Sequence, residues 1–239
     1  MPCYSRLISK KKEASSELSY LTAQSGSDGL ADNSMEFVVF FCDKQDISAI
    51  KVDVRMNREY QLVLHHDALE EGQQYVALED VFAYIARENR PIRINCYLKE
   101  TGLEEAVYKL ADKYALWPQV ELSGTVACRY LPKWSNQILM NIENGMDDSF
   151  HGEHIGRWGE NVLLEALAKL SRSQAKIINI NHQLFTDAVK EKGKLLELEF
   201  SLWTVNDLIA IENYEKENIY NITTRKAWAY IQQKMEQAE

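Results

Sequence analysis

The sequence predicts an α/β fold, a closed TIM (β/α)8 barrel in which eight parallel strands alternate with helices. Short runs rich in β-branched residues alternate with longer stretches of helical period, which is typical of successive βα units. The chain has 239 residues, and a barrel of this type needs about 200–250. The number of units favours a barrel, although an open, doubly wound sheet is built from the same units.

The strands are expected at short apolar runs, and the helices where apolar residues recur every three or four positions. The predicted strands are Ser19–Ala23, Ala49–Val54, Ile92–Leu98, Val120–Thr125, Gln137–Ile142, Lys176–Ile180, Leu196–Trp203 and Ile219–Thr223. The amphipathic helical stretches are Leu78–Asn89, Leu103–Ala115, Gly159–Ser171, Gln183–Lys192 and Asp207–Lys216. We assign residues 1–18 to an N-terminal tail and residues 19–239 to one barrel domain.

The first helix is expected to begin after Asn33, because asparagine is a favourable N-cap residue. Four apolar residues follow closely, namely Phe37, Val38, Phe40 and Phe41. A helix with an apolar stripe of this kind buries it against a sheet. We therefore expect the stripe to pack on the outside of the barrel rather than to form an exposed patch.

One segment interrupts the alternation after the second strand. The polar, turn-like cluster Asn57–Tyr60 is followed by Gln61–Asp67, which has the character of a strand although no helix precedes it. We expect a β-hairpin inserted in the loop after strand 2. In a barrel of this type, that loop lies at the end of the strands where functional residues collect.

The composition disfavours several classes of function. With 27 Lys and Arg against 36 Asp and Glu, the net charge is −9, and no basic stripe for nucleic acid is present. The four cysteines form no CxxC pair, which disfavours structural zinc and a disulfide framework. Lys10–Lys12 precede no apolar signal segment, and no apolar run is long enough to span a membrane. We expect a cytoplasmic protein.

Several motifs share the spacing of one enzyme family. Asp53–Glu59 and Leu62–Asp67 match a second strand and a hairpin that ends in His-Asp. Phe200–Asp207 contains W-T-V-N, and Tyr220–Arg225 matches a closing strand. These stretches resemble the glycerophosphodiester phosphodiesterases, over about Ser19–Ala227. The resemblance implies a TIM barrel with its site at the C-terminal strand ends, and cleavage of glycerophosphodiesters to glycerol 3-phosphate and an alcohol in lipid metabolism.

The sequence departs from that family at residues that carry its chemistry. Gln24 falls at the position of a catalytic histidine, so the resemblance leaves His66 as the remaining one. The metal-binding E-x-D motif reads Lys51–Asp53 here, so an ammonium replaces one carboxylate and Asp53 is a remnant of the metal site. Tyr97 stands where the family has another metal-binding carboxylate, whereas Lys99 matches the lysine of the family.

These departures weaken both the metal binding and the proton transfer that the resemblance implies. Mg²⁺ or Ca²⁺ needs several oxygen ligands, and Lys51 shares a strand face with Asp53 because residues i and i+2 point the same way. We expect no cofactor, with Mg²⁺ or Ca²⁺ only if the protein is an active hydrolase. Gln24 exchanges no proton at neutral pH, and losing one proton-transfer partner costs about 10²–10⁴ in rate. His65 is not expected to replace it, because strand alternation turns it away from His66.

Two functions remain open. In the first, the protein is a catalytically impaired or inactive relative, a pseudoenzyme whose pocket binds a phosphorylated small molecule or a protein partner. Lys51 and Lys99 then supply positive charge, with Tyr97 and Trp203 beside the ligand; a plain Lys51–Asp53 ion pair in an unused pocket is the alternative. In the second, it is an active phosphoric diester hydrolase that uses His66, Asp53, Lys99 and an unidentified acid–base group.

The segment Asp147–His154 gathers five potential metal ligands within eight residues. Its spacing is not that of a helical metal motif, and Gly152 would interrupt a helix. We interpret it as a polar loop after strand 5 that opens toward the functional end of the barrel.

Overall fold

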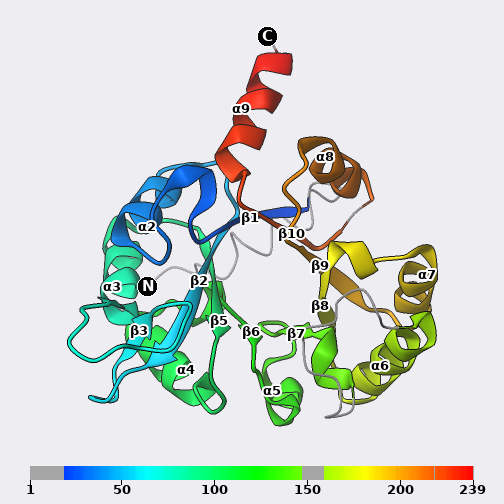
Figure 1. The fold of residues 1–239 in the computed structure, drawn as a ribbon, viewed down its shortest axis with the longest axis horizontal. Helices are drawn as coiled ribbons and strands as arrows, with labels where there is room; N and C mark the ends of the chain where they lie inside the picture. Colours follow the sequence, from blue (N-terminus) through cyan, green and yellow to red (C-terminus); the bar gives the residue numbers. More distant parts are fainter. Residues whose placement is uncertain (1–18, 147–158, 218, 239) are drawn as a thin grey trace, which may run out of the picture.

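A computed structural model describes residues 19–146, 159–217 and 219–238. Parallel strands form the centre of the molecule, and helices surround them (Figure 1). The central strands are β1 (Tyr20–Gln24), β2 (Ala49–Met56), β5 (Arg93–Leu98), β6 (Val120–Gly124), β7 (Leu139–Asn141), β8 (Ile177–Asn181), β9 (Glu199–Trp203) and β10 (Asn221–Thr224). All eight predicted strands are therefore confirmed, with small differences at their ends.

The strands are arranged as a TIM barrel. Parallel pairing runs from β1 through β2 and β5 to β6 in one direction, and through β10, β9 and β8 to β7 in the other. A parallel bridge between Leu122 and Ile138 links β6 to the start of β7. The amide of Leu122 also donates to the carbonyl of Gln137 at 2.7 Å. These contacts connect the two ends of the strand series, as a barrel requires.

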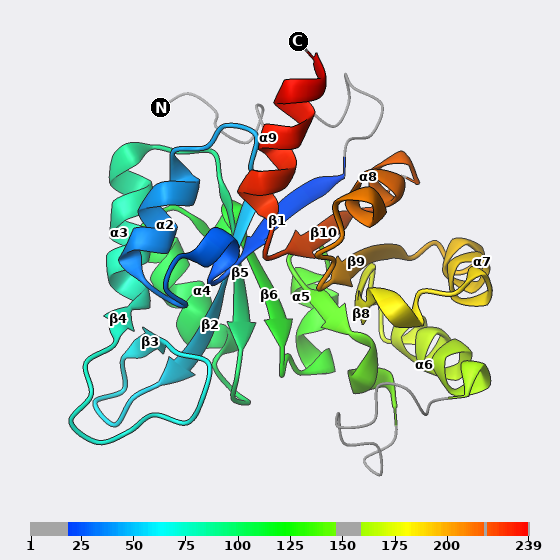
Figure 2. The same cartoon turned by 45° about the horizontal axis from the view of Figure 1, so that its top comes forward.

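Helices cover the outside of the strands, and α9 extends beyond the barrel (Figures 1 and 2). The helices are α2 (Met35–Cys42), α3 (Leu78–Glu88), α4 (Glu104–Lys113), α5 (Leu131–Trp134), α6 (Glu160–Arg172), α7 (Asp187–Leu195), α8 (Leu208–Lys216) and α9 (Ala227–Ala238). The core lies between the two layers, where Ile50 and Val54 of β2 and Phe37 and Phe41 of α2 are fully buried. The predicted stripe of α2 is thus packed on the barrel. None of the helices in the described part of the chain has the length and apolar character needed to cross a bilayer.

The predicted hairpin after strand 2 is confirmed. The end of β2 pairs antiparallel with β3 (Leu62–Leu64), so that Val54 faces Leu64 and Met56 faces Leu62. A further short strand, β4 (Val76–Ala77), pairs with β3 and was not predicted. The hairpin projects from the barrel beside the ends of the central strands (Figure 2).

The inside of the barrel is polar rather than filled with branched apolar side chains, which are usual there. Buried side chains of neighbouring strands form a chain of hydrogen bonds. Its links are Thr22 Oγ1 to Asn221 Oδ1 (2.6 Å), Asn221 Nδ2 to Ser201 Oγ (2.9 Å), Ser201 Oγ to Asn179 Oδ1 (3.0 Å) and Asn179 Nδ2 to Asn141 Oδ1 (2.8 Å).

A charged cluster fills the N-terminal end of the barrel. The guanidinium of Arg93 pairs with the buried carboxylate of Glu121 and donates to the hydroxyl of Tyr220 at 2.7 Å. The Tyr220 hydroxyl donates to Glu121 at 2.9 Å, and Tyr20 places its ring 4.5 Å from the guanidinium. Because this paired cluster occupies the N-terminal end of the barrel, a functional site belongs at the opposite, C-terminal end of the strands.

Candidate functional site

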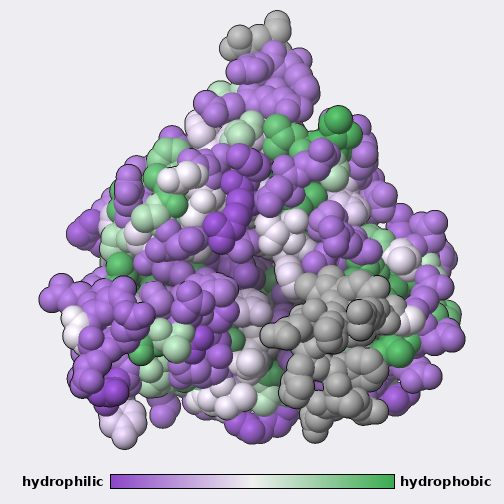
Figure 3. Space-filling view, in the orientation of Figure 1, coloured by the Kyte–Doolittle hydropathy of each residue, from purple (hydrophilic) through white to green (hydrophobic). Residues whose placement is uncertain are grey.

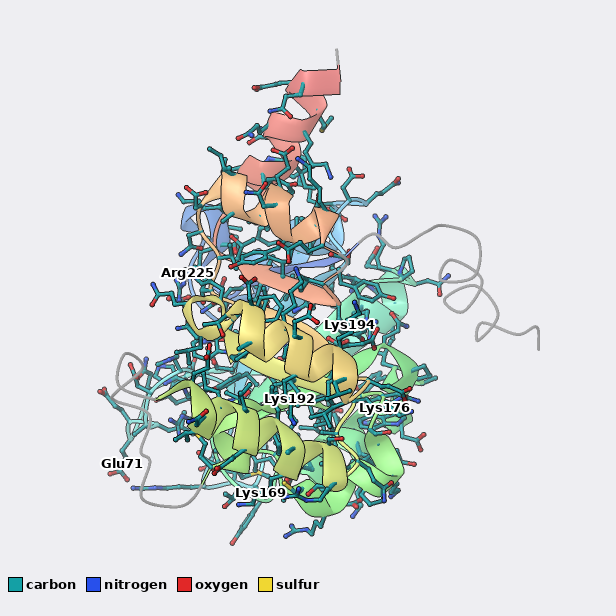
Figure 4. The ribbon with its side chains drawn as sticks, turned by 90° about the vertical axis from the view of Figure 1, so that its right-hand side faces the viewer. Glu71, Lys169, Lys176, Lys192, Lys194 and Arg225 are labelled. Carbon is teal, nitrogen blue, oxygen red and sulfur yellow. The ribbon has the colours of Figure 1, made fainter. Side chains whose placement is uncertain are left out.

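The predicted site residues gather at the C-terminal ends of the strands, which we call the barrel mouth. It is defined by Gln24, Lys51, Asp53, Tyr97, Lys99 and Trp203. Hydrophilic residues surround the centre of this end in the space-filling view (Figure 3). Arg225 lies at the same end of the molecule, whereas Lys176 and Lys194 lie toward the other end (Figure 4).

Lys51 and Tyr97 are in contact at the centre of the barrel mouth. Lys51 and Asp53 point inward from β2, and Asp53 is in register with Tyr97 of the neighbouring strand β5. The Lys51 ammonium lies 4.2 Å from the centre of the Tyr97 ring, and the Lys99 ammonium lies 5.3 Å from the same point. Among the described residues, no ion pair joins Lys51 to Asp53. The aromatic ring, not the carboxylate, is therefore the direct partner of the Lys51 charge.

The barrel mouth has an excess of positive charge. Burial lowers the pKa of Lys51 to about 8, and Lys99 and Arg225 act in the same direction while Asp53 opposes them. Burial also lowers the pKa of Lys99, which Asp53 partly offsets. Lys51 remains mostly protonated at neutral pH. The positive charges of Lys51 and Lys99 therefore attract an anion to the barrel mouth.

Asp53 is held by Asn33. Asn33 Nδ2 donates to Asp53 Oδ2 at 3.1 Å, and the Asp53 amide donates to Asn33 Oδ1 at 2.9 Å. The N-cap of α2 is Ser34, whose hydroxyl accepts a hydrogen bond from the Phe37 amide at 3.1 Å. The prediction that Asn33 caps this helix was therefore wrong, because its amide is used to fix the carboxylate of Asp53.

The described residues of the barrel mouth do not fit a divalent cation. In the part of the chain that the structure describes, no three His, Cys, Asp or Glu side chains are grouped to hold a metal ion. Asp53 has the ammonium of Lys51 on the same strand face, which repels a cation. The predicted polar loop Asp147–His154 lies outside the described residues, so its potential metal ligands are not placed.

Gln24 lies beside the segment that follows Trp203. Gln24 ends β1 in register with Lys51, and its Oε1 accepts a hydrogen bond from Thr204 Oγ1 at 2.8 Å. The peptide bond between Trp203 and Thr204 is cis. Trp203 Nε1 is buried and has no hydrogen-bond partner within the described part of the chain. The amide of Gln24, which the resemblance places at the family's catalytic histidine, is thus engaged with the segment that follows β9.

His66 lies at the edge of the site. Its side chain is 63% exposed, and Nδ1 lies 2.8 Å from Asp67 Oδ1, a bond that lowers the pKa of Asp67. Lys99 also acts to lower the pKa of Asp67, although less than His66 does. Strand β3 ends at Leu64, so alternation does not govern His65 as predicted; its ring instead packs on Tyr75, 4.8 Å away.

Two charged residues of the barrel mouth were not predicted from the sequence. The first is Arg225, the last residue of the closing-strand motif, which pairs with Asp32 at 3.3 Å. Glu143 follows β7 in the short 3-10 turn η4 (Ile142–Gly145), and burial raises its pKa. Glu143 could have been found from the sequence, because Asn141 and Glu143 lie two residues apart at the end of a predicted strand. Functional residues of such barrels gather at these strand ends.

The fold is similar to that of several solved phosphodiesterases. A glycerophosphodiester phosphodiesterase from Parabacteroides distasonis has a TM-score of 0.69 at 14% identity, covering 94% of this chain and 100% of its own. One from Thermotoga maritima has a TM-score of 0.66 at 14% identity, covering 90% and 97%. A phosphodiesterase from Oleispira antarctica, solved with its product sn-glycerol-3-phosphate, has a TM-score of 0.64 at 16% identity, covering 90% and 97%.

These similarities define the class of fold. At such identities they show that the chain has the glycerophosphodiester phosphodiesterase type of TIM barrel, which the sequence predicts. Scans against models of known families and against curated proteins found no match. What the barrel mouth does must therefore be argued from its own residues.

Proposed function

We propose that this protein is a divergent glycerophosphodiester phosphodiesterase-like protein whose barrel mouth binds the phosphate of a small phosphorylated molecule. The observation that carries the proposal is the Lys51 ammonium, which lies against the Tyr97 ring without an ion-pair partner among the described residues. Withdrawing a charge from water is costly unless a counter-charge compensates it. A phosphate group between Lys51 and Lys99 supplies that compensation.

In this proposal, catalysis of the family type is impaired or lost, and no divalent cofactor takes part. The engagement of Gln24 with Thr204 supports the first point, because an amide exchanges no proton. Lys51 and Tyr97 at the positions of carboxylates support the second. Tyr97 and Trp203 form the walls against which the rest of the ligand packs, and the protein acts in the cytoplasm. A protein partner is the alternative occupant of the same mouth.

Isothermal titration calorimetry tests this proposal. Glycerol 3-phosphate and glycerophosphocholine are titrated into the protein in the presence of a chelator, with glycerol as the uncharged control. We expect saturable heat with both phosphates and none with glycerol. Absence of heat at millimolar phosphate ligand would contradict the proposal.

The second candidate function is active hydrolysis of glycerophosphodiesters. It is favoured by the His66–Asp67 pair, which retains an imidazole, the side chain most often used for proton transfer. The test is hydrolysis of a panel of glycerophosphodiesters with Mg²⁺, Ca²⁺ or chelator, for the protein and for His66→Ala. Turnover that needs both metal and His66 would favour this function over impaired catalysis.

A further inference from the structure

Arg225 reaches across the end of β1 toward the strand that carries Lys51. Arg225 directly follows β10, and its guanidinium lies over the backbone of Gly26, where a Cβ atom would come within 2.8 Å of Nη1. The amide of Ser25, the residue before Gly26, donates to the carbonyl of Lys51 at 3.0 Å. Because neighbouring strands lie about 4.8 Å apart, the guanidinium stands one strand away from β2. The barrel mouth therefore has a third cation in addition to Lys51 and Lys99.

The backbone of Arg225 is fixed, whereas its side chain is held by an exposed ion pair. Asn206 Oδ1 accepts a hydrogen bond from the Arg225 amide at 2.9 Å, and the Arg225 carbonyl accepts one from the Asp28 amide at 3.0 Å. The guanidinium pairs with Asp32, but the two side chains are 43% and 56% exposed. An ion pair this exposed is weak, because water screens both charges. The guanidinium can therefore exchange Asp32 for another anion while its backbone stays in place.

We propose that Arg225, Lys51 and Lys99 together bind the dianion of a phosphomonoester in preference to a phosphodiester. The inference rests on the proposed function, because it requires phosphate binding at the barrel mouth, and it names the class of phosphate. A monoester has three terminal oxygens and about two negative charges at neutral pH, whereas a diester has two terminal oxygens and one charge. Three cations suit the monoester in both respects. Arginine adds a planar fork of donors that fits phosphate oxygens.

This preference has a consequence for catalysis. Hydrolysis of a diester consumes the class of phosphate that the three cations favour less and releases the class that they favour more. Slow release of product limits turnover. The preference therefore suits a protein that retains a phosphomonoester, in agreement with impaired catalysis.

Calorimetry with two matched ligands tests the preference. Glycerol 3-phosphate and glycerophosphocholine share the glycerol phosphate group, and they are titrated in chelator at about pH 7.5, above the second phosphate pKa of about 6. We expect the unmodified protein to bind glycerol 3-phosphate at least about tenfold more tightly. Arg225→Met should weaken binding of glycerol 3-phosphate by about 10- to 100-fold and that of glycerophosphocholine by less than about threefold, because the diester has one terminal oxygen fewer for the guanidinium.

Asp32→Asn should act in the opposite direction. It removes the carboxylate that competes for the guanidinium, so the affinity for glycerol 3-phosphate should rise by about threefold or more. Loss of a merely structural contact would not raise it. The matched control is Lys226→Met, which removes an exposed positive charge from the next residue and should leave the preference unchanged. Urea denaturation shows whether Arg225→Met is folded, and Asp32→Asn supplies the test if it is not.

Two results would overturn the inference. If the unmodified protein bound glycerophosphocholine as tightly as glycerol 3-phosphate, no preference for the monoester would exist. If Arg225→Met weakened both ligands equally and Asp32→Asn gave no gain, Arg225 would only support the loops around it. In either case, binding of these ligands would leave the proposed function standing, whereas absence of heat with both would remove the proposed function as well.

Discussion

The ammonium of Lys51 lies 4.2 Å from the centre of the Tyr97 ring, on neighbouring strands at the centre of the barrel mouth. The resemblance in sequence places both residues at positions where the family has metal-binding carboxylates. Together they replace two anions by one cation and one aromatic ring. A ring face stabilises such a cation by about 0.5–2 kcal/mol. The pair therefore places a positive charge, without an ion-pair partner among the described residues, at the barrel mouth.

Binding of a phosphodiester should weaken as the pH rises above about 8. Lys51 has a pKa lowered to about 8, so below that pH it carries its charge and above it the charge is lost. Glycerophosphocholine is a suitable ligand because its diester charge is constant over this range. We expect its affinity, measured by calorimetry, to be flat from about pH 6 to 7.5 and to fall by up to about tenfold per unit above 8. The Lys51→Arg variant keeps its positive charge, so its affinity should not fall over this pH range. An affinity of the unmodified protein that stays constant above pH 8 would contradict the prediction.

Lys51→Met should make the protein more stable at neutral pH. The pKa of Lys51 is lowered in the folded state, so folding disfavours its charged form below about pH 8, and this cost disappears as the pH rises to the unfolded value of 10.5. We expect a gain on the order of 2 kcal/mol in the free energy of unfolding at pH 7, measured by urea denaturation. The gain should vanish above about pH 10.5. A variant less stable than the parent at pH 7 would show that the ammonium is well solvated.

Glu121→Gln should destabilise the fold without affecting ligand binding. It leaves the Arg93 guanidinium buried at the N-terminal end of the barrel without its counter-charge. Removing one partner of a buried ion pair costs about 3–5 kcal/mol. The control is Glu79→Gln, whose partner Lys113 is exposed, and there we expect a loss below about 1 kcal/mol. Equal losses in urea denaturation would mean that the cluster does not fill that end of the barrel as described.

Replacing Lys51 and Tyr97 together by carboxylates should create a cation site. The double substitution K51E/Y97E adds two carboxylates beside Asp53, and Mg²⁺ or Ca²⁺ prefers such oxygen ligands. We expect calcium binding by calorimetry in the double variant and no saturable binding to this site in the unmodified protein. Calcium binding of equal strength in both would show that these two residues are not what disfavours the metal.

The sequence was sufficient to predict the barrel because the residue pattern of each strand indicates both where the strand lies and which side chains face inward. In β2, Ile50, Val52 and Val54 alternate with Lys51 and Asp53, so the same pattern locates the strand and tells which side chains face inward. The hairpin was predictable for a similar reason, since Leu62–Leu64 follows a polar turn without a helix. Contacts between residues far apart in the sequence are harder to predict. No local pattern shows that Asn33 holds Asp53, so Asn33, a favourable N-cap residue, was wrongly assigned as the cap of α2.

The candidate site was predictable only in part. Gln24, Lys51 and Tyr97 were located because motif spacing places them at strand ends. Glu143 was missed because its importance comes from burial and from an unpartnered oxygen, which depend on the packing of other strands. His66 was located by its motif, but its exposure of 63% depends on how the hairpin projects.

The most direct test of the central claim, that Lys51 supplies the charge for phosphate binding, is calorimetric titration of glycerol 3-phosphate in chelator. The unmodified protein, Lys51→Met and Lys194→Met are compared, the last at the other end of the molecule (Figure 4). A hydrogen bond to a charged group contributes about 1.5–3 kcal/mol, so Lys51→Met should bind about 10- to 100-fold more weakly and Lys194→Met should bind unchanged. Equal affinity of Lys51→Met and the unmodified protein would contradict the account.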